Sequence, residues 1–477
     1  MRRSAALITA VGALALGCTG SGEDSGADGS AGGPETSSHP DADLVLSTRG
    51  AGVSATTDDR FQSYNVEMVE VTGGNFWAPY DAGDARTARP PIDLSSERLR
   101  NLARVGAGLC ACRRNLGQLP PYFDVDGTTG GVPPEGFVGV LTTDQWDGVG
   151  DFAEAVDAEV VTSFASSDGT RDDSGVWQDE QARALMTYSR DHGIEITAAE
   201  FINEPNITIG TTAGYTATDF ARDVKAFEAT ADEILPSMRL VGPGAVDDAT
   251  LILGSAPPIS AEDMLEATGP IFDVFSYHYY PKVSERCGST EGPEVALTDE
   301  FLSRIDADKT FYEDLRDRFV PRHRCGSPRQ PRRPVEGTAE ATSYVDVFRY
   351  LDTLGRQAHG DGNVVFHNTL AASDYGLIDE EGFVPRPNYW AAVLWQRLMG
   401  TRSLALDIDD VPENTTVHAS CSAGSSDGRV TYLVMNRSES DDLEVAVDGD
   451  DVESYLLTSP ELLSGRDRSE WQGPGGG

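Results

Sequence analysis

Short apolar runs alternate with helix-length segments between about residues 60 and 400 of this chain. Six of the runs are typical of buried strands: YNVEMVEV (64–71), EVVTSFA (159–165), EITAAEFIN (195–203), RLVGPGAV (239–246), FDVFSYHYY (272–280) and NVVFHNTL (363–370). Among the segments between them, 218–235 has helical periodicity, and in another Ala182, Leu185, Met186 and Ser189 share one face. Because strands joined by helical crossovers form parallel sheets, this alternation predicts an α/β fold.

Two further strand–helix units are expected at 108–118 and 332–338, where the pattern is weaker. Eight such units over residues 60–400 predict a closed (β/α)8 TIM barrel as the catalytic domain. After residue 400 the pattern changes to alternating runs such as RVTYLVMN and DLEVAVDG, which are typical of half-buried strands. We therefore expect a C-terminal β-sandwich side domain over 401–477, incomplete at its Gly-rich end.

The N-terminus has the features of an export signal. The first three residues include two arginines, the apolar run at 5–16 is too short for a permanent membrane span, and Cys18 follows small residues. This pattern is similar to a bacterial lipoprotein signal peptide over 1–18, with Cys18 as the lipidation site; an ordinary secretory signal is the alternative. Residues 19–45 are expected to be a disordered Gly/Ser/Asp tether. The chain is then predicted to be exported, as a cell-envelope lipoprotein (outer membrane or cell surface) or a secreted protein, and to contact a membrane only through its lipid anchor.

Charge and cysteine content narrow the possible partners. The chain has 37 basic and 78 acidic residues, a net charge of −41, which argues against nucleic acid as a partner. No CxxC, HExxH or GxxxxGK[ST] motif occurs, so a structural zinc site, a zincin helix and a P-loop have little support. Of the six cysteines, Cys287 and Cys325 bracket the connection between the sixth and seventh strands, and an exported protein could join them in a disulfide.

Glu204 is the first candidate for a catalytic residue. It ends an apolar strand in the sequence AEFINEPN (199–206), and Pro205 is expected to hold it in an extended conformation. A carboxyl group at the carboxyl end of a barrel strand points into the mouth, where barrel active sites lie. A glycosidase needs such a group as its general acid, with a pKa raised by partial burial, and Asn203 could hold a sugar hydroxyl. The alternative is a carboxylate that only caps the following helix.

Four motifs carry a resemblance to a known family: NEPN after the fourth strand, FSYHYY at the sixth, and HNTLAASDYGLID and RPNYWAAVLWQRLMG at the eighth. They resemble glycoside hydrolase family 79, the group of heparanase and bacterial β-glucuronidases, within the clan of retaining (β/α)8 glycosidases. The resemblance covers most of residues 60–400. It implies two catalytic glutamates, no metal or cofactor, a carbohydrate substrate that contains β-linked glucuronic acid, and a β-sandwich side domain.

The resemblance also implies roles for individual residues. Glu204 matches the acid/base of the family, and Asn203 matches its substrate-binding neighbour. His278 and Tyr280 lie on the sixth strand, where the clan has a tyrosine that hydrogen-bonds the nucleophile. The sequence leaves open whether Tyr279 or Tyr280 points inward, and core packing is the alternative for this strand.

Two further binding residues follow from the resemblance. Tyr375 matches a family tyrosine near the sugar carboxylate, with an ordinary turn aromatic as the alternative. Glu67, on the first strand, falls where the family has an acidic group for sugar hydroxyls.

The nucleophile position departs from the family pattern. Family members carry a sequence resembling TETAEA on strand seven, followed by a glycine-rich loop, whereas this chain has VEGTAEA (335–341) and no such loop. Alignment on TAEA places Gly337 at the nucleophile position, and a shift of one residue places Glu336 there. Such a shift matters, because side chains alternate between the two faces of a strand. We predict Glu336 as the nucleophile, with Glu340 as the alternative.

Two windows rich in Arg and Pro, 108–121 and 316–334, interrupt the predicted barrel. Proline and paired arginines fit poorly into central barrel strands. The windows could form a basic patch for an acidic glycan. We favour a local loss of the reading frame, which would leave an impaired version of a working enzyme.

The function predicted from the sequence is a retaining glycoside hydrolase that releases β-linked glucuronic acid by a two-glutamate double displacement. Because the chain is strongly acidic, we expect glucuronic acid on weakly charged glycans or small glucuronides rather than heparan sulfate. Two alternatives remain open. One is another retaining enzyme of the clan, such as a β-xylosidase or a β-glucosidase; the other is a catalytically impaired, glycan-binding surface lipoprotein.

Overall fold

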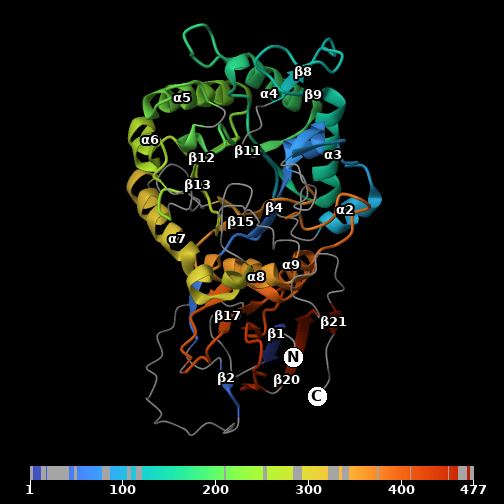
Figure 1. Cartoon of the computed structure of the whole chain (residues 1–477), viewed down its shortest axis with the longest axis vertical. Helices are drawn as coiled ribbons and strands as arrows, with labels where there is room; N and C mark the ends of the chain where they lie inside the picture. The colour runs from blue at the N-terminus through green and yellow to red at the C-terminus, as the bar shows by residue number, and fades with distance from the viewer. Residues whose placement is uncertain are drawn as a thin grey trace.

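The computed structural model describes residues 4–11, 18, 42–47, 51–77, 86–104, 109–113, 121–208, 211–250, 255–282, 293–320, 332–335, 343–372, 375–408, 410–449, 451–459 and 470–472. For the strands at 4–11, 109–113, 332–335 and 470–472 it gives the backbone. Figure 1 shows two parts, a barrel of strands surrounded by helices and, below it, a sheet that contains the red C-terminal strands.

Eight strands form a closed barrel in which neighbours are parallel. They are β4 (Gln62–Glu67), β7 (Leu109–Arg113), β10 (Glu159–Thr162), β11 (Ile196–Glu200), β12 (Arg239–Val246), β13 (Val274–His278), β14 (Arg332–Val335) and β15 (Val364–His367). Each lies beside the barrel strand that precedes it in the sequence, and β15 closes the ring on β4. The two strands with the weakest sequence pattern, β7 and β14, lie within the two predicted units. The predicted α/β class is confirmed.

Alternation along these strands separates two apolar cores. One is a small buried cluster drawn from five barrel strands: Val161, Ala198, Val241, Val274, Val364 and Phe366. Neighbours such as Val160, Ala199 and Phe275 belong instead to the large core shared with the helices. Because side chains alternate, Ser276 and His278 share the inner face with Val274. The inner face of β13 therefore becomes polar towards its carboxyl end.

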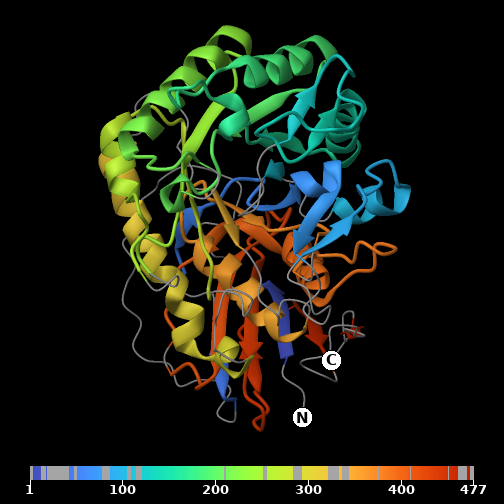
Figure 2. The same ribbon diagram turned by 45° about the horizontal axis from the view of Figure 1, so that its top comes forward.

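Helices cover the outside of the barrel, and Figure 2 shows the green-to-yellow helices as an arc around the strands. The helices outside the barrel are α2 (Glu97–Ala103), α3 (Thr143–Val156), α4 (Glu180–His192), α5 (Ala217–Ile234), α6 (Ala261–Thr268), α7 (Asp299–Phe319), α8 (Val345–Gln357) and α9 (Pro387–Leu398). The helix predicted at 218–235 is α5, and α4 buries the four residues predicted to share a face. Among the described residues, no helix combines the length and the apolar character needed to cross a bilayer.

The first barrel strand is shorter than predicted, because a helix replaces its second half. β4 ends at Glu67, and α1 (Met68–Thr72) follows at once. Glu67 and Glu70 form a capping box, in which each side chain accepts a hydrogen bond from the other residue's backbone amide. The strand predicted at 64–71 is therefore wrong beyond Glu67, where the chain is helical.

Two short sheets lie in the connections between the barrel elements. After α1 the chain forms the antiparallel pair β5 (Gly74–Trp77) and β6 (Arg86–Arg89). Between β7 and α3 it forms the parallel pair β8 (Tyr122–Asp124) and β9 (Val140–Thr142).

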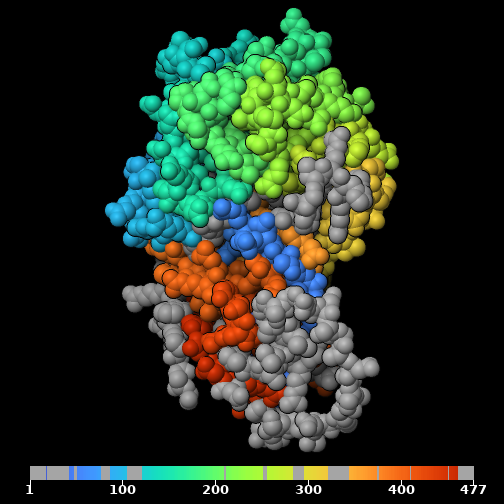
Figure 3. Space-filling view, turned by 180° about the vertical axis from the view of Figure 1, so that it is seen from behind, coloured from blue at the N-terminus to red at the C-terminus, as the bar shows by residue number. Residues whose placement is uncertain are grey.

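The second part is a seven-stranded sheet built from both ends of the chain. Its order is β21 (Glu470–Gln472), β20 (Asp451–Thr458), β1 (Ser4–Val11), β18 (Val430–Asn436), β17 (Thr415–Ser422), β16 (Met399–Leu404) and β3 (Val53–Thr56). The parallel pair β2 (Leu44–Leu46) and β19 (Val445–Val447) packs against this sheet through the cluster that contains Leu44, Leu46, Leu404 and Tyr432. Figure 3 shows this orange-to-red part below the barrel from behind. The side domain predicted over 401–477 therefore also takes strands from residues before the barrel.

The N-terminal segment differs from its prediction in three places. β1 lies inside the predicted signal peptide, where it pairs with both β18 and β20. Leu44, placed in the predicted tether, is only 2% exposed in β2. Cys18 is joined to Cys421 by a disulfide. A sulfur bonded to Cys421 has no thiol to carry a lipid, so this structure and a lipidated Cys18 exclude each other.

The Arg-rich window at 316–334 is described only in part. Arg316 and Arg318 lie on α7, and both make ion pairs with carboxylates, Arg316 with Asp317 and Arg318 with Glu262. These two arginines are therefore neutralised locally rather than presented as a patch for an acidic glycan. The residues predicted to form the other disulfide, Cys287 and Cys325, lie outside the described residues.

Candidate active site

Glu204 lies just past the carboxyl end of β11, at the mouth of the barrel. Its backbone has φ 49° and ψ 53°, in the left-handed region, so the predicted extended conformation is wrong. Pro205 disfavours the right-handed helical region for the residue before it, and a left-handed turn also avoids that clash. Pro205 then starts a short 3-10 helix, Pro205–Ile207. Glu204 occupies the cap position of this helix, but its side chain makes no capping hydrogen bond, so the capping alternative is wrong as well.

Two donors from β13 and the segment after it hold one oxygen of the Glu204 carboxyl group. The Tyr280 hydroxyl donates to Oε1 at 2.7 Å, and His278 Nδ1 lies 2.8 Å from the same atom. The side chain of Glu204 is completely buried, and its Oε2 has no hydrogen-bond partner among the described residues. Oε2 is therefore the oxygen that can exchange a proton with a bound molecule.

The structure also decides between the two tyrosines. Tyr279 belongs to the large core outside the strands and is 2% exposed, whereas Tyr280 reaches Glu204. Strand alternation explains this, because Tyr280 shares the inner face with His278. The tyrosine contacts the predicted acid/base, which differs from the contact with a nucleophile that the resemblance implies.

A second buried carboxylate, absent from the sequence analysis, completes this group. Glu200 is 1% exposed, and its Oε2 lies 3.3 Å from His278 Nε2. Its Oε1 accepts a hydrogen bond from the Ser276 hydroxyl at 2.6 Å. Burial alone would lower the pKa of His278, but the charges of Glu200 and Glu204 and their hydrogen bonds raise it to about 9. The imidazole is therefore protonated at neutral pH, with a donor facing each carboxylate.

The other predicted binding residues lie at or after the ends of barrel strands, but outside the hydrogen-bonded group of Glu200, Glu204, His278 and Tyr280. Asn203 precedes Glu204 and is partly buried. Glu67, 1% exposed, ends β4 and takes part in the capping box of α1. Tyr375 packs against Val69 and Phe76, and its carbonyl oxygen lies 2.9 Å from His367 Nε2. Since β4 and β15 are neighbours, Glu67 and the segment that contains Tyr375 lie at adjacent strand ends.

Glu70 is a further buried carboxyl group that the sequence analysis missed. It accepts hydrogen bonds from the Thr369 hydroxyl at 2.6 Å and from the Ala371 amide at 3.0 Å. Burial raises its pKa to about 7, although these hydrogen bonds oppose the shift. Glu70 thus ties α1 to the segment between β15 and Tyr375.

The predicted nucleophile is not placed by the structure. β14 ends at Val335, which pairs with His367, and Glu336 is the next residue in the chain. Both Glu336 and its alternative Glu340 lie outside the described residues. Among the described residues, no three His, Cys, Asp or Glu side chains are grouped as metal ligands would be.

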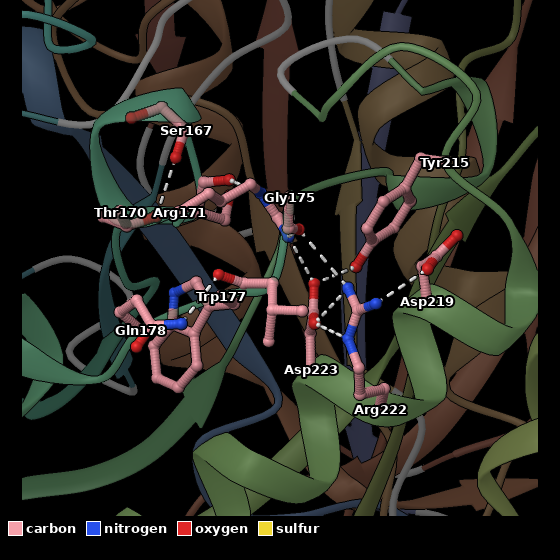
Figure 4. Close-up of polar contacts among 12 residues, drawn as sticks. Ser167, Thr170, Arg171, Gly175, Trp177, Gln178, Tyr215, Asp219, Arg222 and Asp223 are labelled. Atoms are coloured by element: carbon pink, nitrogen blue, oxygen red, sulfur yellow. Dashed lines mark hydrogen bonds and ion pairs between the residues drawn. The ribbon is translucent and has the colours of Figure 1, made fainter. Parts of the chain in front are cut away.

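A buried ion-pair network fixes the loops that follow β10 and β11 (Figure 4). Arg171 Nη1 lies 2.7 Å from Asp223 Oδ2, and both side chains are at most 2% exposed. Asp223 also accepts a hydrogen bond from Tyr215 at 3.0 Å and pairs with Arg222 at 2.8 Å. Arg171 Nη1 donates to the Gly175 carbonyl at 3.0 Å, which closes the loop on itself. Two loops at the barrel mouth are therefore anchored to α5.

Comparisons with known proteins agree with this arrangement. Residues 135–249 match the model of "Glycosyl hydrolase family 79, N-terminal domain". Heparanase-like protein 1 of Arabidopsis thaliana is 28% identical over 65% of this chain and 56% of its own length. Baicalin-beta-D-glucuronidase of Scutellaria baicalensis is 25% identical over 67% of this chain and 63% of its own. The chain thus spans less than two thirds of either relative.

Among solved structures, the α-L-arabinofuranosidase of Thermotoga maritima has a similar fold. Its TM-score is 0.59, with 16% identity over 88% of this chain and 91% of the other. At this identity the likeness concerns the fold alone. The matched family model and the heparanase-like and glucuronidase relatives, together with a buried Glu204 at the barrel mouth, lead to one conclusion. The chain is similar to members of glycoside hydrolase family 79, and the model of the family's N-terminal domain matches its residues 135–249.

Proposed function

We propose that this chain is a retaining glycoside hydrolase that releases β-linked glucuronic acid, with Glu204 as its acid/base. The observation that carries the proposal is the geometry of the Glu204 carboxyl group. Tyr280 and His278 both hold Oε1, and Oε2 has no hydrogen-bond partner among the described residues. A buried carboxyl group oriented in this way can give a proton to a leaving oxygen and later take one from water.

In the first step, Glu204 protonates the glycosidic oxygen while a second carboxylate attacks the anomeric carbon. The bond to the leaving group breaks, and a covalent sugar–enzyme ester forms. In the second step, Glu204, now ionised, removes a proton from water, which attacks the same carbon and releases the sugar with its β configuration. Two donors at Oε1 stabilise the ionised form between the steps.

We propose Glu336 as the nucleophile and Glu340 as the alternative. In the sequence Glu336 directly follows β14, a barrel strand, and residues at the carboxyl ends of barrel strands form the active sites of such folds. Retaining enzymes hold the two carboxyl groups about 5–5.5 Å apart, which requires the nucleophile to face the mouth. A fluorinated glucuronosyl fluoride that traps the ester would label the nucleophile, and fragment mass spectrometry of the labelled peptide distinguishes the two glutamates. Label on neither residue contradicts this assignment.

For the substrate, we propose glucuronic acid on weakly charged glycans or on small glucuronides. The names of the heparanase-like and glucuronidase relatives support a glucuronic acid substrate. The net charge of −41 disfavours a densely sulfated chain, although salt screens this repulsion beyond about 8 Å. Comparable turnover of highly sulfated oligosaccharides and neutral-backbone glucuronides would contradict this preference.

We also propose export of the chain, for which the Cys18–Cys421 disulfide is supporting evidence, because disulfides persist in oxidising compartments. Lipidation of Cys18 is the competing state. Peptide mapping without reduction distinguishes the two, since the disulfide links a Cys18 peptide to a Cys421 peptide. A diacylglyceryl group on Cys18 supports the anchored form, and a free thiol in the purified exported chain contradicts both.

The direct test is a panel of aryl glycosides assayed with the full chain. We expect cleavage of an aryl β-D-glucuronide and little or no cleavage of the β-xyloside and β-glucoside. Glu204→Gln should abolish cleavage of the glucuronide, since the amide cannot exchange the proton. Glu233→Gln is the matched control, because Glu233 is 65% exposed on α5, where it pairs with Arg183. Preferred cleavage of another glycoside favours a different clan activity; binding of glucuronides without turnover favours the impaired, glycan-binding protein.

A further inference from the structure

Glu200 and Glu204 lie on opposite sides of one imidazole ring. His278 Nδ1 is 2.8 Å from Glu204 Oε1, and its Nε2 is 3.3 Å from Glu200 Oε2. All three side chains are at most 2% exposed. Neither ring nitrogen therefore faces bulk water, and each faces a carboxylate.

The backbone of the next strand leaves room for the Glu200 carboxyl group. Gly244 on β12 has φ +69°, and a Cβ built there would lie 2.7 Å from Glu200 Oε1. The register between β12 and β13 shifts at this point, between Pro243 and Ala245. A side chain at position 244 would thus displace Glu200, while the Ser276 hydroxyl at 2.6 Å holds it in place.

We propose that Glu200 is a positioning residue for the acid/base Glu204 and that it acts through His278. The chain of contacts runs from Ser276 to Glu200, then to His278 and to Glu204. This inference rests on the proposed function of Glu204, and it names a residue that does not touch the substrate.

The physical effect of Glu200 is on the ring nitrogen that faces Glu204. A carboxylate at Nε2 favours a proton on both nitrogens of His278, and Nδ1 then donates to Oε1. The catalytic proton of Glu204 then resides on Oε2. Without Glu200 the ring can become neutral, and Nδ1 can become an acceptor that competes for the same proton.

The groups that face His278 support this assignment. In the described part of the chain they are Glu200 on β11, Glu204 after β11, and Tyr280, whose hydroxyl shares Oε1 with the ring. Burial by itself lowers the pKa of His278, and the two carboxylates more than compensate for it.

A kinetic test uses Glu200→Gln and two aryl β-D-glucuronides. The constant kcat/KM reports the first step, and a dinitrophenolate leaving group needs no protonation whereas a phenolate does. We expect kcat/KM for the phenyl glucuronide to fall on the order of tenfold to a hundredfold, and kcat/KM for the dinitrophenyl glucuronide to change little. Gly244→Ala should reproduce this split by displacing Glu200.

Asp352→Asn is the matched control for loss of a buried carboxylate. Asp352 on α8 is 1% exposed and contacts His418 Nε2 at 2.9 Å, at the junction with the seven-stranded sheet. If this variant loses activity through misfolding, it should lose it equally on both substrates. An equal loss on both substrates in Glu200→Gln would overturn the proposal.

A second measurement does not depend on glucuronidase activity. Histidine-selective NMR of the full chain, with His278 assigned by its absence in His278→Asn, follows the ring through a pH titration. We expect His278 to keep both N–H protons to about pH 9 in the parent chain and to lose one at lower pH in Glu200→Gln. An unchanged titration overturns the role of Glu200 even if the parent cleaves glucuronides. If Glu200→Gln shifts the His278 titration but the parent chain cleaves no glucuronide, the coupling between Glu200 and His278 is supported and only the proposed function is overturned.

Discussion

The hydroxyl group of Tyr280 lies 2.7 Å from Oε1 of Glu204, although the two residues are 76 positions apart in the chain. One follows β13, and the other follows β11. Their contact exists because both strands end at the same mouth of the barrel and because the inner face of β13 continues to Tyr280.

Removing this hydroxyl should impair the chemistry more than the fold. We expect Tyr280→Phe to lower kcat/KM for an aryl β-D-glucuronide about tenfold, because a hydrogen bond to a charged group contributes about 1.5–3 kcal/mol. Its melting temperature should stay close to that of the parent, since the ring remains. The control is Tyr279→Phe, because that residue lies in the outer core. Equal kinetics in Tyr280→Phe and the parent would contradict a role for the contact.

In the ion-pair network at the mouth, replacing Asp223 should destabilise the chain more than replacing Arg171. Asp223→Asn leaves Arg171 buried without its ion-pair partner, and we expect it to destabilise the chain by about 3 kcal/mol. Arg171→Met should cost less, because Arg222 still pairs with Asp223. Urea unfolding of both variants measures the difference. A larger loss in Arg171→Met would show that Arg222 does not compensate.

Glu70 should make the stability of the chain depend on pH. Its pKa is raised by burial to about 7 in the folded state, from an ordinary value of 4.5, so the protonated group favours the folded state. This contribution is complete below about pH 4.5 and is lost as pH rises to about 7, a change on the order of 3 kcal/mol.

Glu70→Gln removes this titration. At low pH the variant should be less stable than the parent, because an amide fits the three donors around position 70 less well than the carboxyl group does. As pH rises from 5 to 7.5 the parent loses stability and the variant does not, so the stability of the variant relative to the parent should increase. Thermal unfolding of both chains across this range is the measurement. A constant difference between them would mean that Glu70 is ionised throughout.

Apolar runs were sufficient to locate six of the barrel strands, whereas β7 and β14 have a poor apolar pattern and were expected from the count of strand–helix units that a closed barrel needs. Apolar runs were not sufficient at α1, where the capping box of Glu67 and Glu70 ends the strand, a local effect that hydrophobic periodicity does not report. The apolar run near the N-terminus was ambiguous for a physical reason. The apolar core of a signal peptide and a central strand such as β1 need the same residues.

The sequence predicted the catalytic carboxyl group of the site but not the side chains that contact it. The turn at Asn203-Glu204-Pro205 indicated a carboxyl group at the mouth, whereas its left-handed backbone and its contact with Tyr280 depend on the fold. Glu200 was missed because a single polar residue within an apolar run does not by itself indicate a functional site. The signal that could have found it was the alternation that places Ala198 and Glu200 on one face.

The most direct test of Glu204 as the acid/base uses Glu204→Ala, dinitrophenyl β-D-glucuronide and azide. In this variant the first step proceeds without acid assistance, and the covalent sugar–enzyme ester accumulates because no base activates water. Azide needs no base and can occupy the space left by the carboxyl group. We expect azide to restore kcat and to give the β-glucuronosyl azide, identified by NMR. Turnover at the parent rate without azide, or no β-azide product, would contradict the role of Glu204 in a retaining mechanism.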